Sequence, residues 1–169
     1  MKQIITAPSL EIPMNPTVFL GGGITNCDNW QSEVCDYFLS SENITLFNPR
    51  RETFNILDST ATAQQIHWEY SMLEKCDIFS MYFCNSGSVQ PICLYELGRN
   101  VVRMQNKFPT TWKRRVIVSI EEGYKRTQDV LHQMSYAMPG VYIDAMATPE
   151  FHAKRILMSF KYLRQRGDL

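Results

Sequence analysis

Short apolar, β-prone runs alternate with longer helical segments along this chain, and short turns join them. We expect strands at residues 17–21, 44–47, 77–84, 115–120 and 141–143, and helices at residues 30–39, 59–75, 92–104, 127–134 and 149–165. The first strand is apolar throughout, as in a strand that is buried on both faces. Strands alternating with helices predict a parallel sheet covered by helices on both faces. Ligands of such α/β folds bind outside the carboxyl ends of the strands.

The size and charge of the chain narrow its class. Its 169 residues fit one domain, so we expect a single domain over residues 1–169. Basic and acidic residues number 17 each, and this balance argues against a nucleic-acid partner, since such proteins carry a basic excess. The beginning of the chain lacks a long apolar run, and no stretch has the length of a membrane helix. We therefore expect a cytoplasmic protein without membrane contact.

The cysteines and histidines do not suggest a metal site. The five cysteines are odd in number and contain no C-x-x-C pair, which argues against a disulfide framework and against zinc. We interpret them as free, buried thiols in a reducing compartment. The histidines His67, His132 and His152 show no metal-binding spacing and are interpreted as surface or interface residues.

A glycine-rich turn, Gly21-Gly22-Gly23, directly follows the first expected strand. Its glycines allow the backbone to approach a ligand closely and to present amide donors. The turn matches a dinucleotide-binding motif in its first two glycines only, because Asn26 stands at the third position. Arg50 and Arg51 follow the second strand, where an NADP 2′-phosphate would bind. An NADP-type binding module and a ligand-free turn both stay open.

Glu96 lies near the start of the helix that follows the third strand, where the ligand crevice of such a sheet opens. Ser86, Gly87 and Ser88 precede it and offer hydroxyl and amide groups for a sugar. An acid at this position also complements the helix dipole without any further role.

Glu69 is the second acidic candidate, on the helix that precedes the third strand. The spacing predicts an apolar stripe of Ile66, Tyr70 and Leu73 on this helix, with Glu69 at its edge. A carboxylate at such an edge is either partnered, for example in a salt bridge, or functional.

Four segments, in order over residues 17–100, resemble the nucleoside 2-deoxyribosyltransferase family in its transferase-like branch. They are Val18-Phe19-Leu20-Gly21-Gly22-Gly23-Ile24-Thr25, Phe47-Asn48-Pro49-Arg50-Arg51, Trp68-Glu69 before Cys76-Asp77, and Tyr95-Glu96-Leu97-Gly98. The resemblance implies a flavodoxin-like three-layer sandwich with a five-stranded parallel sheet. It also implies a homodimer or higher homo-oligomer, in which residues 133–147 could complete a neighbour's site.

The same resemblance implies the roles of individual residues. Glu96 corresponds to the carboxylate that attacks the sugar, and Glu69 to the acid that contacts the base, where the transferases usually have aspartate. Phe19 stands where many transferases have tyrosine, and Gln90 stands where they have aspartate. The substrate-binding candidates are Phe19, Gly21, Gly22, Gly23, Asn48, Arg50, Arg51, Ser86, Gly87, Ser88 and Gln90.

The activity that the resemblance implies is transfer of a 2-deoxyribosyl group between nucleobases through a glycosyl-glutamate intermediate. The partners are then a nucleoside or nucleotide and a free acceptor base, and the chemistry needs neither a metal nor an organic cofactor. An N-glycoside hydrolase of nucleosides or nucleoside 5′-monophosphates is the first alternative. A nucleotide-binding module without catalysis is the second.

Overall fold

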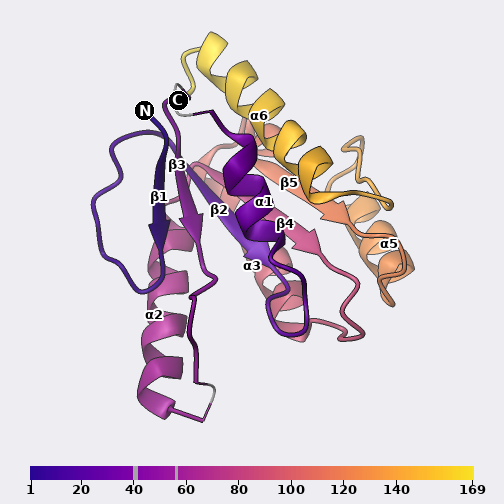
Figure 1. Cartoon of the computed structure of the whole chain (residues 1–169). Coiled ribbons are helices and arrows are strands. Elements are labelled where there is room, and N and C mark those ends of the chain that lie inside the picture. Colours follow the sequence, from indigo (N-terminus) through magenta and orange to yellow (C-terminus); the bar gives the residue numbers. More distant parts are fainter. Residues whose placement is uncertain (40–41, 56) are drawn as a thin grey trace.

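A computed structural model describes residues 1–39, 42–55 and 57–169 of the chain. Its sheet contains five parallel strands in the order β1-β3-β2-β4-β5, which confirms the expected α/β flavodoxin-like sandwich (Figure 1). The strands are β1 (Gln3–Thr6), β2 (Thr17–Gly22), β3 (Thr45–Asn48), β4 (Ile78–Phe83) and β5 (Val116–Ile120). The helices are α1 (Trp30–Tyr37), α2 (Ser59–Lys75), α3 (Pro91–Lys107), α4 (Trp112–Arg115), α5 (Thr127–Ala137) and α6 (Pro149–Gln165).

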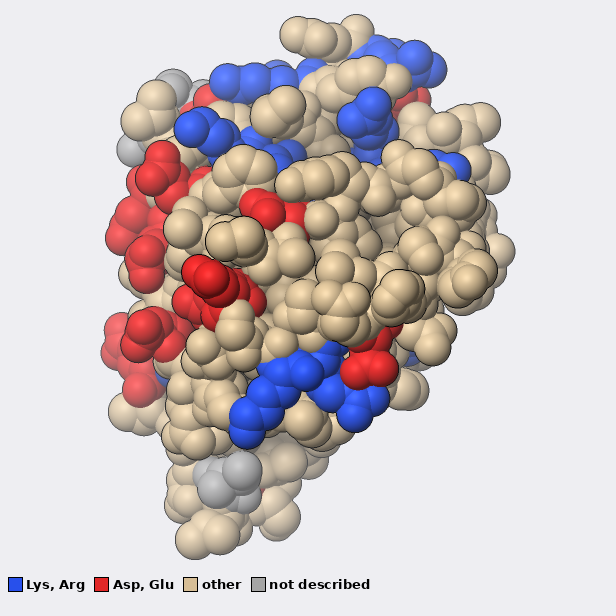
Figure 2. Space-filling model, turned by 90° about the vertical axis from the view of Figure 1, so that its right-hand side faces the viewer, with Lys and Arg blue, Asp and Glu red and all other residues tan. Residues whose placement is uncertain are grey.

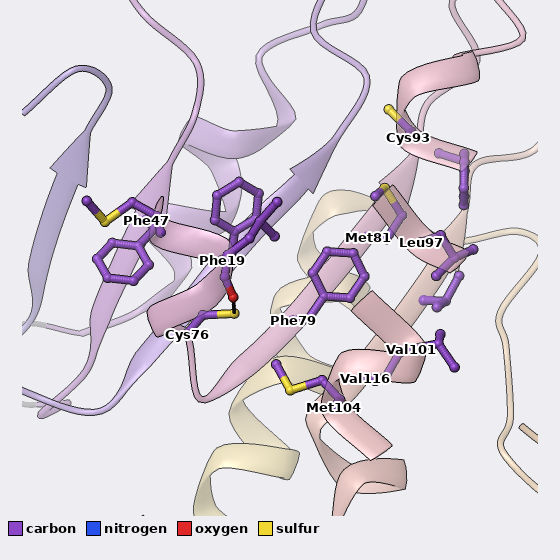
Figure 3. Close-up of a cluster of buried hydrophobic side chains, with 14 of the residues drawn as sticks. Phe19, Phe47, Cys76, Phe79, Met81, Cys93, Leu97, Val101, Met104 and Val116 are labelled. Atoms are coloured by element: carbon purple, nitrogen blue, oxygen red, sulfur yellow. Dashed lines mark hydrogen bonds between the residues drawn. The ribbon is translucent and has the colours of Figure 1, made fainter. Parts of the chain in front are cut away.

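Two hydrophobic clusters lie on opposite faces of the sheet and make the three layers. One cluster contains side chains of α2, α3 and α5, and the other contains side chains of α1 and α6. Figure 3 shows the first cluster, in which Phe19, Phe47 and Phe79 from three neighbouring strands lie under the two helices α2 and α3. Phe19 pairs in register with both Phe47 and Phe79. This apolar layer holds α2 and α3 against the sheet and so fixes the position of both helices.

One of the expected strands is wrong. Residues 141–143 form no strand, and this part of the chain meets β5 only through a single bridge between Ser119 and Asp144. The fifth strand is instead β1, which pairs with β3 at the other edge of the sheet. Only Ile5 of β1 is fully buried, so the apolar signal of this edge strand is short.

The expected stripe on α2 is wrong at two of its three residues, and only Leu73 is buried as expected. Ile66 and Tyr70 are 61% and 55% exposed, whereas Trp68 and Met72 are buried against the sheet. Both sets have helical spacing, and the packing of the larger Trp68 decides which of them faces the core. The helix begins after Asp58, whose side chain accepts hydrogen bonds from two amides of the first turn, as expected for an N-cap.

The structure corrects two further expectations. His152 is completely buried, with Nδ1 2.9 Å from Ser119 Oγ, and burial lowers its pKa to about 3. Cys27 and Cys84 form a disulfide, because the loops that follow the neighbouring strands β2 and β4 bring their Cα atoms to 6.3 Å. Cys35, Cys76 and Cys93 are free and buried, as predicted.

The surface carries charges of both signs. On the face that looks to the right in Figure 1, basic side chains gather along the upper rim and again at the lower centre, acidic ones lie mainly along the left flank, and most of the right-hand part is uncharged (Figure 2). Neither sign dominates this face, in line with the formal net charge of zero. Within the part of the chain that the structure describes, each helix is too short or too polar to cross a membrane.

Candidate active site

The order of the strands creates a switch point between β2 and β4. From β2 the chain continues through α1 to β3 on one side, and from β4 it continues through α3 to β5 on the other. Crevices at the carboxyl ends of such strands are the usual ligand sites of open parallel sheets. A pocket of about 240 Å³ lies at this edge, lined by Phe19, Gly21, Gly22, Gly23, Ile24, Thr25, Pro49, Glu69, Ser88, Gln90, Pro91, Ile92, Cys93 and Glu96.

The glycine turn forms one wall of this pocket, and larger residues do not fit there. A Cβ atom on Gly22 would lie 2.3 Å from the carbonyl oxygen of Tyr82, and its φ of +151° also favours glycine. A Cβ atom on Gly23 would lie 2.5 Å from Cys84 Sγ and 2.7 Å from Gln90 Oε1. The turn therefore presses against the loop that follows β4, and the two loops together shape the pocket.

Two half-buried carboxyl groups, Glu69 on α2 and Glu96 on α3, line the pocket from different helices. Burial and the neighbouring charge of Glu69 raise the pKa of Glu96 to about 8, although Arg99 acts in the opposite direction. Burial also raises the pKa of Glu69, but a hydrogen bond from Gln65 and the charge of Arg51 lower it. Two carboxyls in one pocket with different surroundings are typical of acid–base or nucleophilic chemistry.

A chain of hydrogen bonds leads from the end of β3 to Glu69. Arg51 Nε donates to Gln65 Oε1 at 2.6 Å, and Gln65 Nε2 donates to Glu69 Oε1 at 2.7 Å. The same Nε2 atom also donates to the carbonyl oxygen of Pro49 at 2.8 Å. Arg51 is thus connected to Glu69 through the buried side-chain amide of Gln65, and it does not itself line the pocket.

Gln90 places a buried acceptor at the pocket. Its backbone is left-handed, with a φ of 48°, which is uncommon for a residue other than glycine. Its Nε2 atom donates to the carbonyl oxygen of Cys84 at 2.5 Å, whereas its buried Oε1 atom has no partner among the described residues. A buried acceptor without a partner beside a pocket is suited to a donor group of a ligand.

Arg50 is directed away from the pocket. Its guanidinium group donates to the carbonyl oxygens of Ile24 and Cys27 at 2.9 and 2.6 Å, and to that of Asp28 at 2.5 Å. It thereby anchors the loop that follows β2, and burial lowers its pKa. Asn48 accepts a hydrogen bond from the Arg50 amide at 3.0 Å, so it also serves the local backbone.

The structure therefore brings eight of the thirteen sequence-based candidates together in one pocket and places the other five outside its lining. Glu69, Glu96, Phe19, Ser88, Gln90 and the glycine turn line one pocket, whereas Ser86, Gly87, Asn48, Arg50 and Arg51 lie outside its lining. Cys93 and Gln65 were not among the residues predicted from sequence, although each has helical spacing to a candidate. Cys93 is three residues before Glu96, and Gln65 is four residues before Glu69. Burial and the neighbouring carboxylates raise the pKa of Cys93 to about 12.

A parallel sheet with a pocket at its carboxyl edge, lined by a glycine turn and by two carboxyl groups from the covering helices, defines the class of the protein, an α/β domain with a small-molecule pocket. The family model described as "Nucleoside 2-deoxyribosyltransferase like" matches residues 15–108. Because the match covers more than half of the chain, the protein belongs to this family. Both carboxyl groups lie inside the matched region. A search among curated proteins found no match.

Proposed function

We propose that the protein is a nucleoside 2-deoxyribosyltransferase, in which Glu96 is the nucleophile and Glu69 contacts the nucleobase. Membership of this family implies that the substrates are small molecules, namely nucleosides or nucleobases. The observation that supports the proposal is that the two carboxyl groups line one pocket together with the glycine turn, at the switch point of the sheet. The buried acceptor of Gln90 adds a place for a donor group of the substrate.

The proposed reaction has two steps at C1′ of the sugar. An oxygen of the Glu96 carboxylate forms a bond to C1′ while the bond from C1′ to the base nitrogen breaks, and the electron pair leaves with the base. A nitrogen of the acceptor base then attacks C1′ from the face that the first base left, the ester bond to Glu96 breaks, and the proton of the acceptor nitrogen passes back to the carboxyl groups of the pocket. The sugar thus keeps its configuration, and Glu96 returns to its starting state.

The leaving base needs a proton or a hydrogen bond. Since the pKa of Glu96 is raised to about 8, its carboxyl group holds a proton near neutral pH. Glu96 must lose this proton before it attacks, and the departing base takes up a proton. We propose that this proton reaches the departing base through Glu69, the group nearest to the base.

The pocket favours nucleosides over their 5′-monophosphates. Among the described residues, neither lysine nor arginine is in its lining, and the donors of Arg50 are directed at backbone carbonyls. A phosphate at this site would lack the charge-assisted hydrogen bonds that normally hold it. We therefore propose nucleosides as the substrates and a free nucleobase as the acceptor.

We also propose that the chain forms a homodimer or a higher homo-oligomer. Large apolar side chains beside the pocket are exposed, and on α2 and α3 they include Ile66, Tyr70, Ile92 and Tyr95 at 55–67% exposure. Exposed apolar residues that gather near a site are typical of an interface. Light scattering at micromolar concentration tests this proposal, and a fully active monomer would contradict it.

Incubation of the protein with a purine or pyrimidine 2′-deoxynucleoside, with and without a different free base, tests the activity by chromatography. A new nucleoside indicates the transferase, free deoxyribose indicates the hydrolase, and no turnover favours the binding module. Glu96→Ala should lower turnover by at least ~10³-fold, the scale of losing a covalent nucleophile. Glu122→Gln, at an exposed position outside the pocket lining, is the matched control. Normal turnover in a folded Glu96→Ala variant would remove Glu96 from the mechanism.

A further inference from the structure

Gln65 connects Arg51 to Glu69 through one buried side-chain amide. Its exposed fraction is 9%, and it lies one helical turn before Glu69 on α2. Both of its polar atoms are engaged: Oε1 accepts from Arg51, and Nε2 donates to Glu69 and to the Pro49 carbonyl. No hydrogen of the amide remains for a ligand, so Gln65 does not contact substrate through a free donor.

The partners of this amide permit one orientation only. Arg51 Nε can donate but cannot accept, whereas the Pro49 carbonyl and the Glu69 carboxylate accept. If the amide were turned over, its oxygen would face two acceptors and its NH₂ group would face a donor. All three hydrogen bonds would then be lost inside a buried region, where polar groups need partners.

We propose that Gln65, oriented by Arg51, is a positioning residue that keeps Glu69 turned into the pocket with one carboxylate oxygen occupied and the other left for the substrate. This inference rests on the proposed function, because it concerns the group that meets the base. Glu69 Oε1 is the oxygen that Gln65 holds. Glu69 Oε2 accepts no hydrogen bond from the described residues, so one acceptor remains for an N–H group at the edge of a base.

The groups around Glu69 support this role. Glu96 and Cys93 face it from α3, and Arg51 lies beyond the end of β3. The hydrogen bond from Gln65 and the charge of Arg51 both lower the pKa of Glu69, against the effect of burial. Loss of the Gln65 donor therefore raises the pKa of Glu69 and leaves its carboxylate free to rotate.

The test compares Gln65→Met with Gln64→Met. Methionine has a length similar to that of glutamine but no amide, so Gln65→Met removes the contacts to Glu69 and Arg51. Gln64 also accepts from Arg51, at 3.2 Å, but it is exposed and forms no hydrogen bond with Glu69 among the described residues, which makes Gln64→Met the matched control. If Gln65→Met does not fold, Arg51→Met provides the same test, because it releases the amide from the other side.

Two measurements are needed. Carboxyl carbon NMR on protein with labelled glutamate follows the titration of Glu69, with Glu69→Gln for assignment. The midpoint should move to higher pH in Gln65→Met and should not move in Gln64→Met. The kcat/KM for the deoxynucleoside should fall about 10- to 100-fold in Gln65→Met, the scale of a misplaced catalytic contact, and should stay unchanged in Gln64→Met.

The two measurements separate this inference from the proposed function. If the protein transfers no sugar but the titration of Glu69 shifts in Gln65→Met alone, the proposed function fails and the positioning role stands. If the protein is active and Gln65→Met leaves both the titration and kcat/KM unchanged, the positioning role is overturned. Equal effects of Gln64→Met and Gln65→Met would overturn it as well.

Discussion

Replacing Glu96 with glutamine should stabilise the folded protein at alkaline pH and have little effect near pH 5. The pKa of this carboxyl is about 8 in the folded protein, against an ordinary value of 4.5. The folded state therefore holds the proton more tightly than the unfolded chain does. For this reason the contribution of Glu96 to the free energy of unfolding decreases as the pH rises from 4.5 to 8, and above pH 8 it decreases no further. An amide at this position does not titrate and escapes the loss.

The size of the effect follows from the same two values. At 1.36 kcal/mol per pH unit, the interval from 4.5 to about 8 corresponds to about 5 kcal/mol as an upper limit. Glu96 is only half-buried beside an open pocket, and water screens part of the penalty. We expect Glu96→Gln to gain about 2–4 kcal/mol at pH 9 and less than about 1 kcal/mol at pH 5.

Urea unfolding at pH 5, 7 and 9 measures this difference, at one protein concentration because association would change the apparent stability. The exposed Glu122→Gln variant is the control and should follow the wild type at each pH. A gain of equal size at pH 5 and pH 9 would refute the electrostatic argument. So would a Glu96→Gln variant that is less stable than the wild type at pH 9.

Three further predictions follow from the geometry of the pocket. The kcat/KM of the wild type should fall as pH rises through about 8, because the site then loses the proton that the departing base takes up. Glu69→Gln should move this midpoint to lower pH because it removes the neighbouring charge, and pH–rate profiles check both. Gly23→Ala should lower the stability of the protein by about 1–3 kcal/mol, since its Cβ atom would lie 2.5 Å from Cys84 Sγ. Gly98→Ala should raise the stability by up to ~1 kcal/mol, because the space around the added carbon is open. Thermal unfolding of both variants measures these changes. Arg50→Leu should lower kcat/KM equally for a nucleoside and its 5′-monophosphate, because it releases the loop after β2; a loss confined to the monophosphate would instead indicate a phosphate contact.

Local sequence patterns determined the parts of this protein that depend on neighbouring residues. The apolar runs and the helical segments between them specified four of the five strands and the parallel arrangement, because period and strand propensity are local properties. The glycine turn and Glu96 were expected at one edge of the sheet, since the carboxyl ends of adjacent parallel strands lie there, and the family resemblance added Glu69; all three line one pocket.

Contacts between distant segments were decided by the tertiary structure alone. On α2, Trp68 and not Ile66 points into the hydrophobic core, although each belongs to a set of apolar residues with helical spacing. The reason is that only one side of the helix can pack against the apolar face of the sheet. β1 is held by its pairing with β3, and its four residues carry little signal of their own.

The adjacent arginines show the same division at the site. Sequence placed Arg50 and Arg51 together after β3, but the fold directs one guanidinium to the carbonyls of a loop and the other to the amide of Gln65. Their partners lie between 14 and 26 residues away along the chain, so spacing within the sequence could not identify them. Sequence thus determined which residues could carry chemistry, and the packing of α2 and two loops against the sheet decided which of them meet, because hydrogen bonds require distances that only the folded chain sets.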